Sequence, residues 1–212
     1  MKLSLLLLNQ LIIMLCFLLI GYVLAKKKLI TMDGCKELVN LLLLVVIPFV
    51  ILNSFLVEKT NEKTIGLFCA MLLSLISFIL SMGFSYMFYG AKHRIENFSA
   101  AFSNAGFIGI PLVQATLGSE MVFYIACYVA FLNIFQWIYG DKKNISIHNI
   151  LTNAVLISFC LSFLLYMLEL NNIPYLKNVA QSIAAINSPL AMIIIGVYLT
   201  EVSIKNIFCK RK

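Results

Sequence analysis

The chain has 212 residues, of which 62% are hydrophobic and only 12% are charged, and its formal net charge is +7. Soluble globular domains carry about 25% charged residues, so this composition excludes an ordinary soluble domain. The positive charge is spread over several separate loops, which argues against nucleic acid as a partner. The composition predicts an all-α, polytopic helical membrane protein whose partner is the lipid bilayer.

Seven apolar stretches reach the length of about 20 residues that a membrane-spanning helix needs. The first resembles a signal peptide, but it is too long for one and ends at a lysine triplet without a small-residue cleavage site, so we expect it to be a retained helix. The predicted spans are Leu3–Leu24, Leu38–Val57, Thr64–Tyr89, Phe98–Leu117, Met121–Tyr139, Ile150–Leu168 and Val179–Leu199.

The fourth stretch is the most informative, because Asn104 is followed there by Gly106, Gly109 and Pro111. Proline lacks an N–H and clashes with the carbonyl four residues earlier, and glycine weakens a helix. We therefore expect the helix to break. In lipid a break is tolerated where it is buried in protein or lines a cavity, and secondary transporters place such breaks at the substrate site. A simple kink is the alternative, since glycine and proline are common in membrane helices.

Basic residues alternate between the two sides of the predicted membrane. Loops 1–2, 3–4 and 5–6 and the C-terminal tail hold 12 of the 16 Lys and Arg residues. By the positive-inside rule the N-terminus is outside and the basic tail is cytoplasmic.

Prolines also interrupt the second and seventh stretches, which run in opposite directions. Pro48 precedes an Asn-Ser pair at residues 53–54, and Pro189 follows another at residues 187–188. Interrupted helices of opposite direction point to an inverted repeat.

Catalytic and cofactor motifs are not visible in the sequence. His93 and His148 have no partner at a metal-ligand spacing, and the six cysteines form no C-x-x-C pair. Acidic residues fall near the ends of the spans, so a proton relay through membrane carboxylates has no support. We expect no enzyme activity, no metal and no cofactor.

Several runs resemble the auxin efflux carrier family of membrane transporters. The most specific is Asn97–Leu112 (NFSAAFSNAGFIGIPL), followed by Leu117-Gly118. Leu44–Phe49 (LVVIPF) with Asn53–Phe55 (NSF), and Ser188–Leu199 (SPLAMIIIGVYL), occur in the order that the family has.

The resemblance implies a secondary transporter of ten helices in two inverted five-helix repeats. Helices one, two, six and seven would form a scaffold, and helices three to five and eight to ten a transport domain in which the broken fourth and ninth helices cross. The substrates would be small organic anions, such as auxin, malate or malonate, carried across the plasma membrane. The substrate-binding residues would be Asn104, Gly106, Gly109, Pro111 and Gln114.

On this pattern residues 1–140 form the first repeat, and residues 141–212 form two helices of the second repeat with a basic tail. Because the chain stops at Lys212, we expect it to be C-terminally truncated, or completed by a second copy or a longer homologous subunit. Two alternatives remain open at this stage, a non-transporting accessory subunit and a seven-helix membrane receptor.

Overall fold

The computed structural model describes residues 2–90, 92–140, 152–170 and 173–201. The described residues form helices and turns without any strand, which confirms the all-α prediction. The predicted orientation depends partly on the basic residues of the 5–6 loop and the C-terminal tail. Both segments lie outside the described residues.

Four of the predicted spans are single helices. They are α1 (Lys2–Lys26), α4 (Asn61–Tyr89), α7 (Val122–Gly140) and α9 (Ala154–Met167). The first three are long and apolar enough to cross a bilayer, whereas α9, with 14 residues, is shorter than the usual span.

The other three spans are composite, and each contains a proline. Span 2 is α2 (Met32–Leu41), η1 (Leu42–Val46) and α3 (Ile47–Phe55); span 4 is α5 (Arg94–Ala101), η2 (Ala105–Gly109) and α6 (Ile110–Leu117); span 7 is α10 (Pro174–Ala184) and α11 (Asn187–Leu199). A short turn, η3 (Ser119–Met121), joins span 4 to α7. Together with the three long single helices, these composite spans make six candidate membrane crossings among the described residues.

The elements η1 and η2 are π-helical turns, and an Ile-Pro pair follows each of them directly. The N–H of Ile47 donates to the carbonyl of Leu42, and the N–H of Ile110 donates to that of Ala105, each five residues back. A proline ring would clash with the carbonyl four residues earlier in an α-helix. The wider π turn accommodates the proline, so both helices continue through Ile-Pro without breaking.

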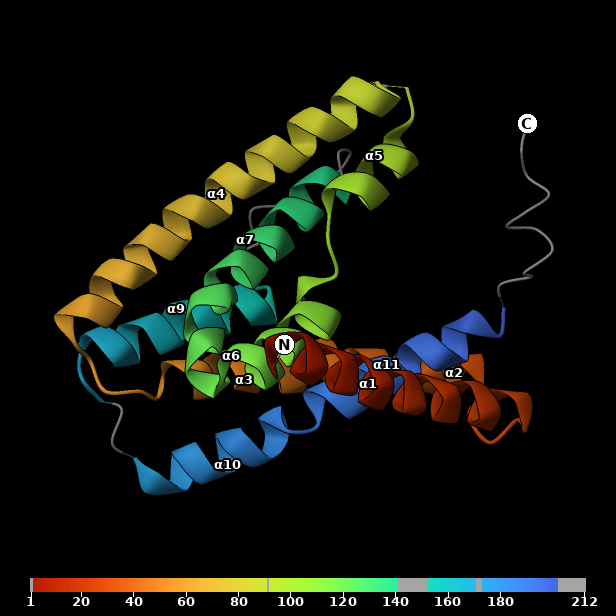
Figure 1. The fold of residues 1–212 in the computed structure, drawn as a ribbon, viewed down its shortest axis with the longest axis horizontal. Helices are drawn as coiled ribbons and strands as arrows, with labels where there is room; N and C mark the ends of the chain where they lie inside the picture. The colour runs from red at the N-terminus through yellow and green to blue at the C-terminus, as the bar shows by residue number, and fades with distance from the viewer. Residues whose placement is uncertain (1, 91, 141–151, 171–172, 202–212) are drawn as a thin grey trace.

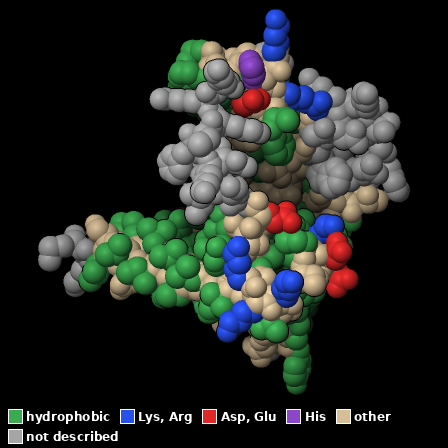
Figure 2. Space-filling view, turned by 90° about the vertical axis from the view of Figure 1, so that its right-hand side faces the viewer, with side chains coloured by type: hydrophobic (Ala, Val, Ile, Leu, Met, Phe, Trp, Pro, Cys, Tyr) green, Lys and Arg blue, Asp and Glu red, His purple; other side chains and the backbone are tan. Residues whose placement is uncertain are grey.

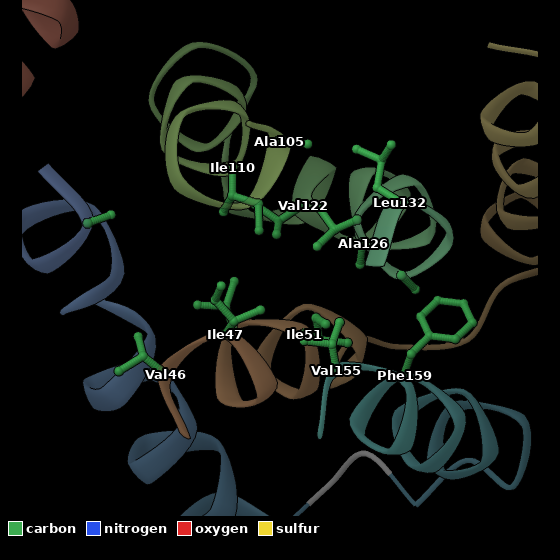
Figure 3. Packing of buried hydrophobic residues seen from close by; sticks show 14 of the residues in the cluster. Val46, Ile47, Ile51, Ala105, Ile110, Val122, Ala126, Leu132, Val155 and Phe159 are labelled. Carbon is green, nitrogen blue, oxygen red and sulfur yellow. The ribbon is translucent and has the colours of Figure 1, made fainter. Parts of the chain in front are cut away.

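The helices pack into two groups that meet along a buried core. In one group α1 packs along α11, and α3 packs against α9 and α10; in the other, α4 packs against α5 and α7 (Figure 1). The core between them is mostly apolar. In it, Ile47 and Ile51 of α3 face Ile110 of α6 and Val122 and Ala126 of α7 (Figure 3).

The outer surface of the helices is apolar, as a bilayer requires. Leucine, isoleucine and phenylalanine side chains are exposed along most of α1 and α4. Figure 2 shows the face at the right-hand side of Figure 1, where Lys and Arg side chains lie near the top and over the lower half, with Asp and Glu side chains among them. The end of α1, the start of α5 and the end of α11 lie at this side (Figure 1).

Candidate functional site

The break in span 4 lies at residues 102–104, before the glycines and the proline. Phe102 has extended backbone angles (φ −98°, ψ 102°), and Asn104 (φ −83°, ψ 62°) is the N-cap of the helix that follows. The Asn104 side chain accepts a hydrogen bond from the N–H of Phe107 at 3.2 Å, which stabilises this helix start.

The expectation that Gly106, Gly109 and Pro111 themselves break the helix is therefore wrong. All three lie within the continuous helix Ala105–Leu117, because the π turn accommodates the proline ring. Lack of space for a side chain does not explain Gly106 and Gly109 either. A Cβ at Gly106 would lie 3.5 Å from Ile47 Cδ1, and one at Gly109 would lie 3.5 Å from Ile125 Cδ1, which are ordinary contacts.

A cavity of about 230 Å³ opens beside the break, between span 2, span 4 and α7. Its polar side chains are Ser103 and Asn104 from the break and Asn133 and Gln136 from α7. The full lining is Leu43, Ile47, Phe102, Ser103, Asn104, Ala105, Gly106, Phe107, Val129, Leu132, Asn133 and Gln136.

Residues at the start of this helix, with unpaired backbone donors, lie in the wall of the cavity. The N–H groups of Ala105 and Gly106 donate to no described group, as is usual in the first turn of a helix. Ser103 Oγ lies 3.2 Å from the hydroxyl of Tyr128. The helix start also carries a partial positive charge from its aligned peptide dipoles. The cavity wall can therefore bind an anionic group without a Lys or Arg side chain.

The carbonyl of Gly106 has an unusual environment. Its ordinary α-helical donor, the N–H of Ile110, is bonded to Ala105, and the next residue, Pro111, has no N–H. The Nδ2 group of Asn187, at the start of α11, donates to this carbonyl at 3.3 Å. Asn187 is 2% exposed, and its Oδ1 has no hydrogen-bond partner among the described residues.

The structure brings together only part of the predicted site. Asn104 and Gly106 line the cavity, whereas Gly109 and Pro111 do not. Gln114 lies elsewhere, in a second cavity of about 290 Å³. That cavity also holds Lys177 and Gln181 of α10, Asn53 at the end of span 2, and Glu120, whose carboxylate lies 3.9 Å from Lys63 Nζ.

The predicted site residues did not include Leu43, Asn133, Gln136 or Asn187. The amides carried a usable signal, since an amide in an apolar span needs a partner or a ligand. The signal for Leu43 was only its position five residues before Pro48, which has no N–H to donate to the Leu43 carbonyl.

A chain of several apolar spans, with a polar cavity at a broken helix, has the architecture of a membrane transport protein. A family model described as "Membrane transport protein" matches residues 6–144. The chain belongs to this family, the auxin efflux carrier family. It is a family of transporters and not of enzymes. No curated protein matches the chain.

Proposed function

We propose that this chain is the carrier of a small organic anion and that the cavity beside Asn104 holds the anion's carboxylate. The free N–H groups of Ala105 and Gly106, at a helix start, are the observation that carries the proposal. Backbone N–H groups and the helix dipole together form a favourable anion site.

The size of the cavity supports a small solute. Pockets for drug-sized ligands measure roughly 300–1,000 Å³, and this one measures about 230 Å³. A short mono- or dicarboxylate, such as malonate, is of suitable size. The polar groups of Ser103 and Gln136 can then contact its remaining oxygens.

Spans 3, 4 and 5 are the part that we propose to move during transport. They pack mainly on one another, and spans 1, 2, 6 and 7 pack mainly among themselves. The cavity lies between the two groups, where relative motion would expose it to either side. In this arrangement residues 1–140 form one repeat and residues 141–212 part of an inverted second one. We place the protein in the plasma membrane by its resemblance to the family. The distribution of basic residues supports an N-terminus outside.

Anion uptake into liposomes tests the proposal. Proteoliposomes that contain only this chain should take up radiolabelled malonate or malate faster than empty liposomes. Asn104→Ala should slow uptake at least about tenfold, because it removes the cap that orders the helix start, worth roughly 1 kcal/mol, together with a polar group of the cavity.

Gln114→Ala is the matched control, since Gln114 is a polar residue of the same span but lines the other cavity. Its uptake should stay within about twofold of wild type, as expected for a change that removes no ligand contact. Uptake no faster than that of empty liposomes would refute transport by this chain alone. Equal losses in the two variants would refute the placement of the site.

A further inference from the structure

The two Ile-Pro pairs leave two backbone carbonyls without a donor in their own helices. Gly106 is one. Leu43 is the other: its ordinary donor, the N–H of Ile47, is bonded to Leu42, and the next residue is Pro48. Ile47 and Ile110, which precede the two prolines, face each other across the core (Figure 3). Both Leu43 and Gly106 line the cavity beside the break.

A third acceptor, the side-chain oxygen of Asn187, lies beside the Gly106 carbonyl. Asn187 Nδ2 is bonded to the Gly106 carbonyl, so its Oδ1, on the same amide group, is held close to that carbonyl. This Oδ1 is buried and has no partner among the described residues. Helix α11, which begins at Asn187, packs against both η1 and η2. The three proline-containing spans therefore meet at this point.

The buried Asn187 Oδ1 requires a ligand that supplies positive charge or a donor, and the carbonyls of Leu43 and Gly106 can each accept one. A buried acceptor without a partner is costly, and a carbonyl has two lone pairs, so Gly106 can accept a second interaction beside Asn187. A carboxylate would bring only further acceptors to this part of the site. The groups that we propose for the carboxylate are the N–H groups of residues 105 and 106, which are donors and not acceptors.

We propose that the Leu43 and Gly106 carbonyls and Asn187 Oδ1 bind a monovalent metal cation, of which the sodium ion is our probe. Neutral carbonyl and amide oxygens are typical ligands of such ions at interrupted membrane helices. Divalent ions are instead bound mainly through carboxylates, and no cluster of acidic, His or Cys residues occurs in the part of the chain that the structure describes. The inference deepens the proposed function, because the cation would offset the charge of the anion, but its binding is measured without any anion.

Direct binding of radioactive sodium to the purified full chain in lipid nanodiscs is the first measurement, with choline chloride keeping the ionic strength constant. Wild type should show saturable binding that unlabelled sodium displaces and choline does not. Pro48→Ala and Pro111→Ala each restore an N–H that can bond Leu43 or Gly106, so each should weaken sodium binding at least about tenfold, as expected when a charge-assisted contact is lost. Pro174→Ala, at the start of α10 and after no π turn, should bind sodium like wild type.

Variants of Asn187 distinguish its proposed role as a cation ligand from its role as the hydrogen-bond donor to Gly106. Asn187→Asp keeps the side-chain oxygen and loses the donor to Gly106, so it should bind sodium at least as tightly as wild type. Asn187→Leu should lose binding. Thermal unfolding in choline chloride checks that each variant is folded.

Absence of displaceable sodium binding in wild type would overturn the inference. Wild-type affinity in both proline variants would do the same, and so would equal losses in Asn187→Asp and Asn187→Leu. Sodium binding by a chain that takes up no malonate would leave this site standing and reject the anion proposal. Malonate uptake that is the same in sodium and in choline would leave the anion proposal standing.

Discussion

The contact between α1 and α11 gives the sharpest test of the fold. Gly21 and Gly196 lie where these helices cross. A Cβ built on Gly21 would lie 2.1 Å from the carbonyl oxygen of Ile193, and one on Gly196 would lie 2.0 Å from that of Leu18. The two backbones therefore touch, and no side chain can rotate out of the way.

The cost of Gly21→Ala follows from these distances. Ordinary carbon–oxygen contacts between helices are about 3.3–3.6 Å, so the helices would have to separate by about 1.2 Å or more. A gap of that order forfeits about half or more of each dispersion contact along the seam. Overpacking of this kind costs about 1–3 kcal/mol, against a gain of up to about 1 kcal/mol from replacing glycine within a helix. The net result is a less stable protein, and Gly196→Ala should behave alike.

Thermal unfolding in nanodiscs, followed by intrinsic fluorescence, measures this effect, and the chain offers a matched control. Gly83 is within α4, and a Cβ there would meet no atom within 4 Å. Gly83→Ala should therefore leave the midpoint unchanged or raise it. A midpoint for Gly21→Ala equal to that of Gly83→Ala would show that α1 and α11 do not make this contact.

Two further predictions concern the polar contacts that hold loops in place. Asn97 is fully buried; its Nδ2 donates to the Gly90 carbonyl at 2.5 Å, and its Oδ1 accepts from Ser85 at 2.6 Å. Asn97→Ala should lower the stability by about 1–3 kcal/mol, since it removes the side-chain donor to the Gly90 carbonyl. Ser85 loses one of its two acceptors and keeps the backbone carbonyl of residue 97, at 2.9 Å. A change below the error of thermal unfolding would contradict this. Lys59 pairs with the largely exposed Glu169 at 3.2 Å, so Lys59→Ala should cost only about 0–1 kcal/mol; the difference should shrink at high salt, and a loss independent of salt would exclude an ionic origin.

Composition and hydrophobic length alone were enough to identify the membrane class and the positions of the spans. Every described span overlaps the stretch predicted for it, because a bilayer imposes one requirement on every such helix. The family resemblance is confirmed by the family model, and it was visible in the sequence because it depends on a local run of residues. The run Asn97–Leu112 is a local pattern, and it lies within the residues that the family model matches.

The position of the break was not predictable from local rules. Glycine and proline pointed to residues 106–111, yet the chain leaves the helix at residues 102–104, where Phe102 packs against Phe78 with ring centroids 5.3 Å apart and Asn104 caps the next helix. Proline is tolerated because a π turn accommodates it and because Asn187 bonds the carbonyl that the turn leaves free.

Asn187 lies 81 residues further along the chain than Gly106. No pattern within span 4 could reveal that partner. Likewise, only the packing of α7 and α10 decided that Asn104 and Gln114, which are close in sequence, line different cavities. The sequence by itself determined which segments enter the bilayer, whereas the tertiary structure decided which polar groups meet there. The physical reason is that hydrophobic burial depends on local composition, but a hydrogen bond in the membrane depends on which helix supplies the partner.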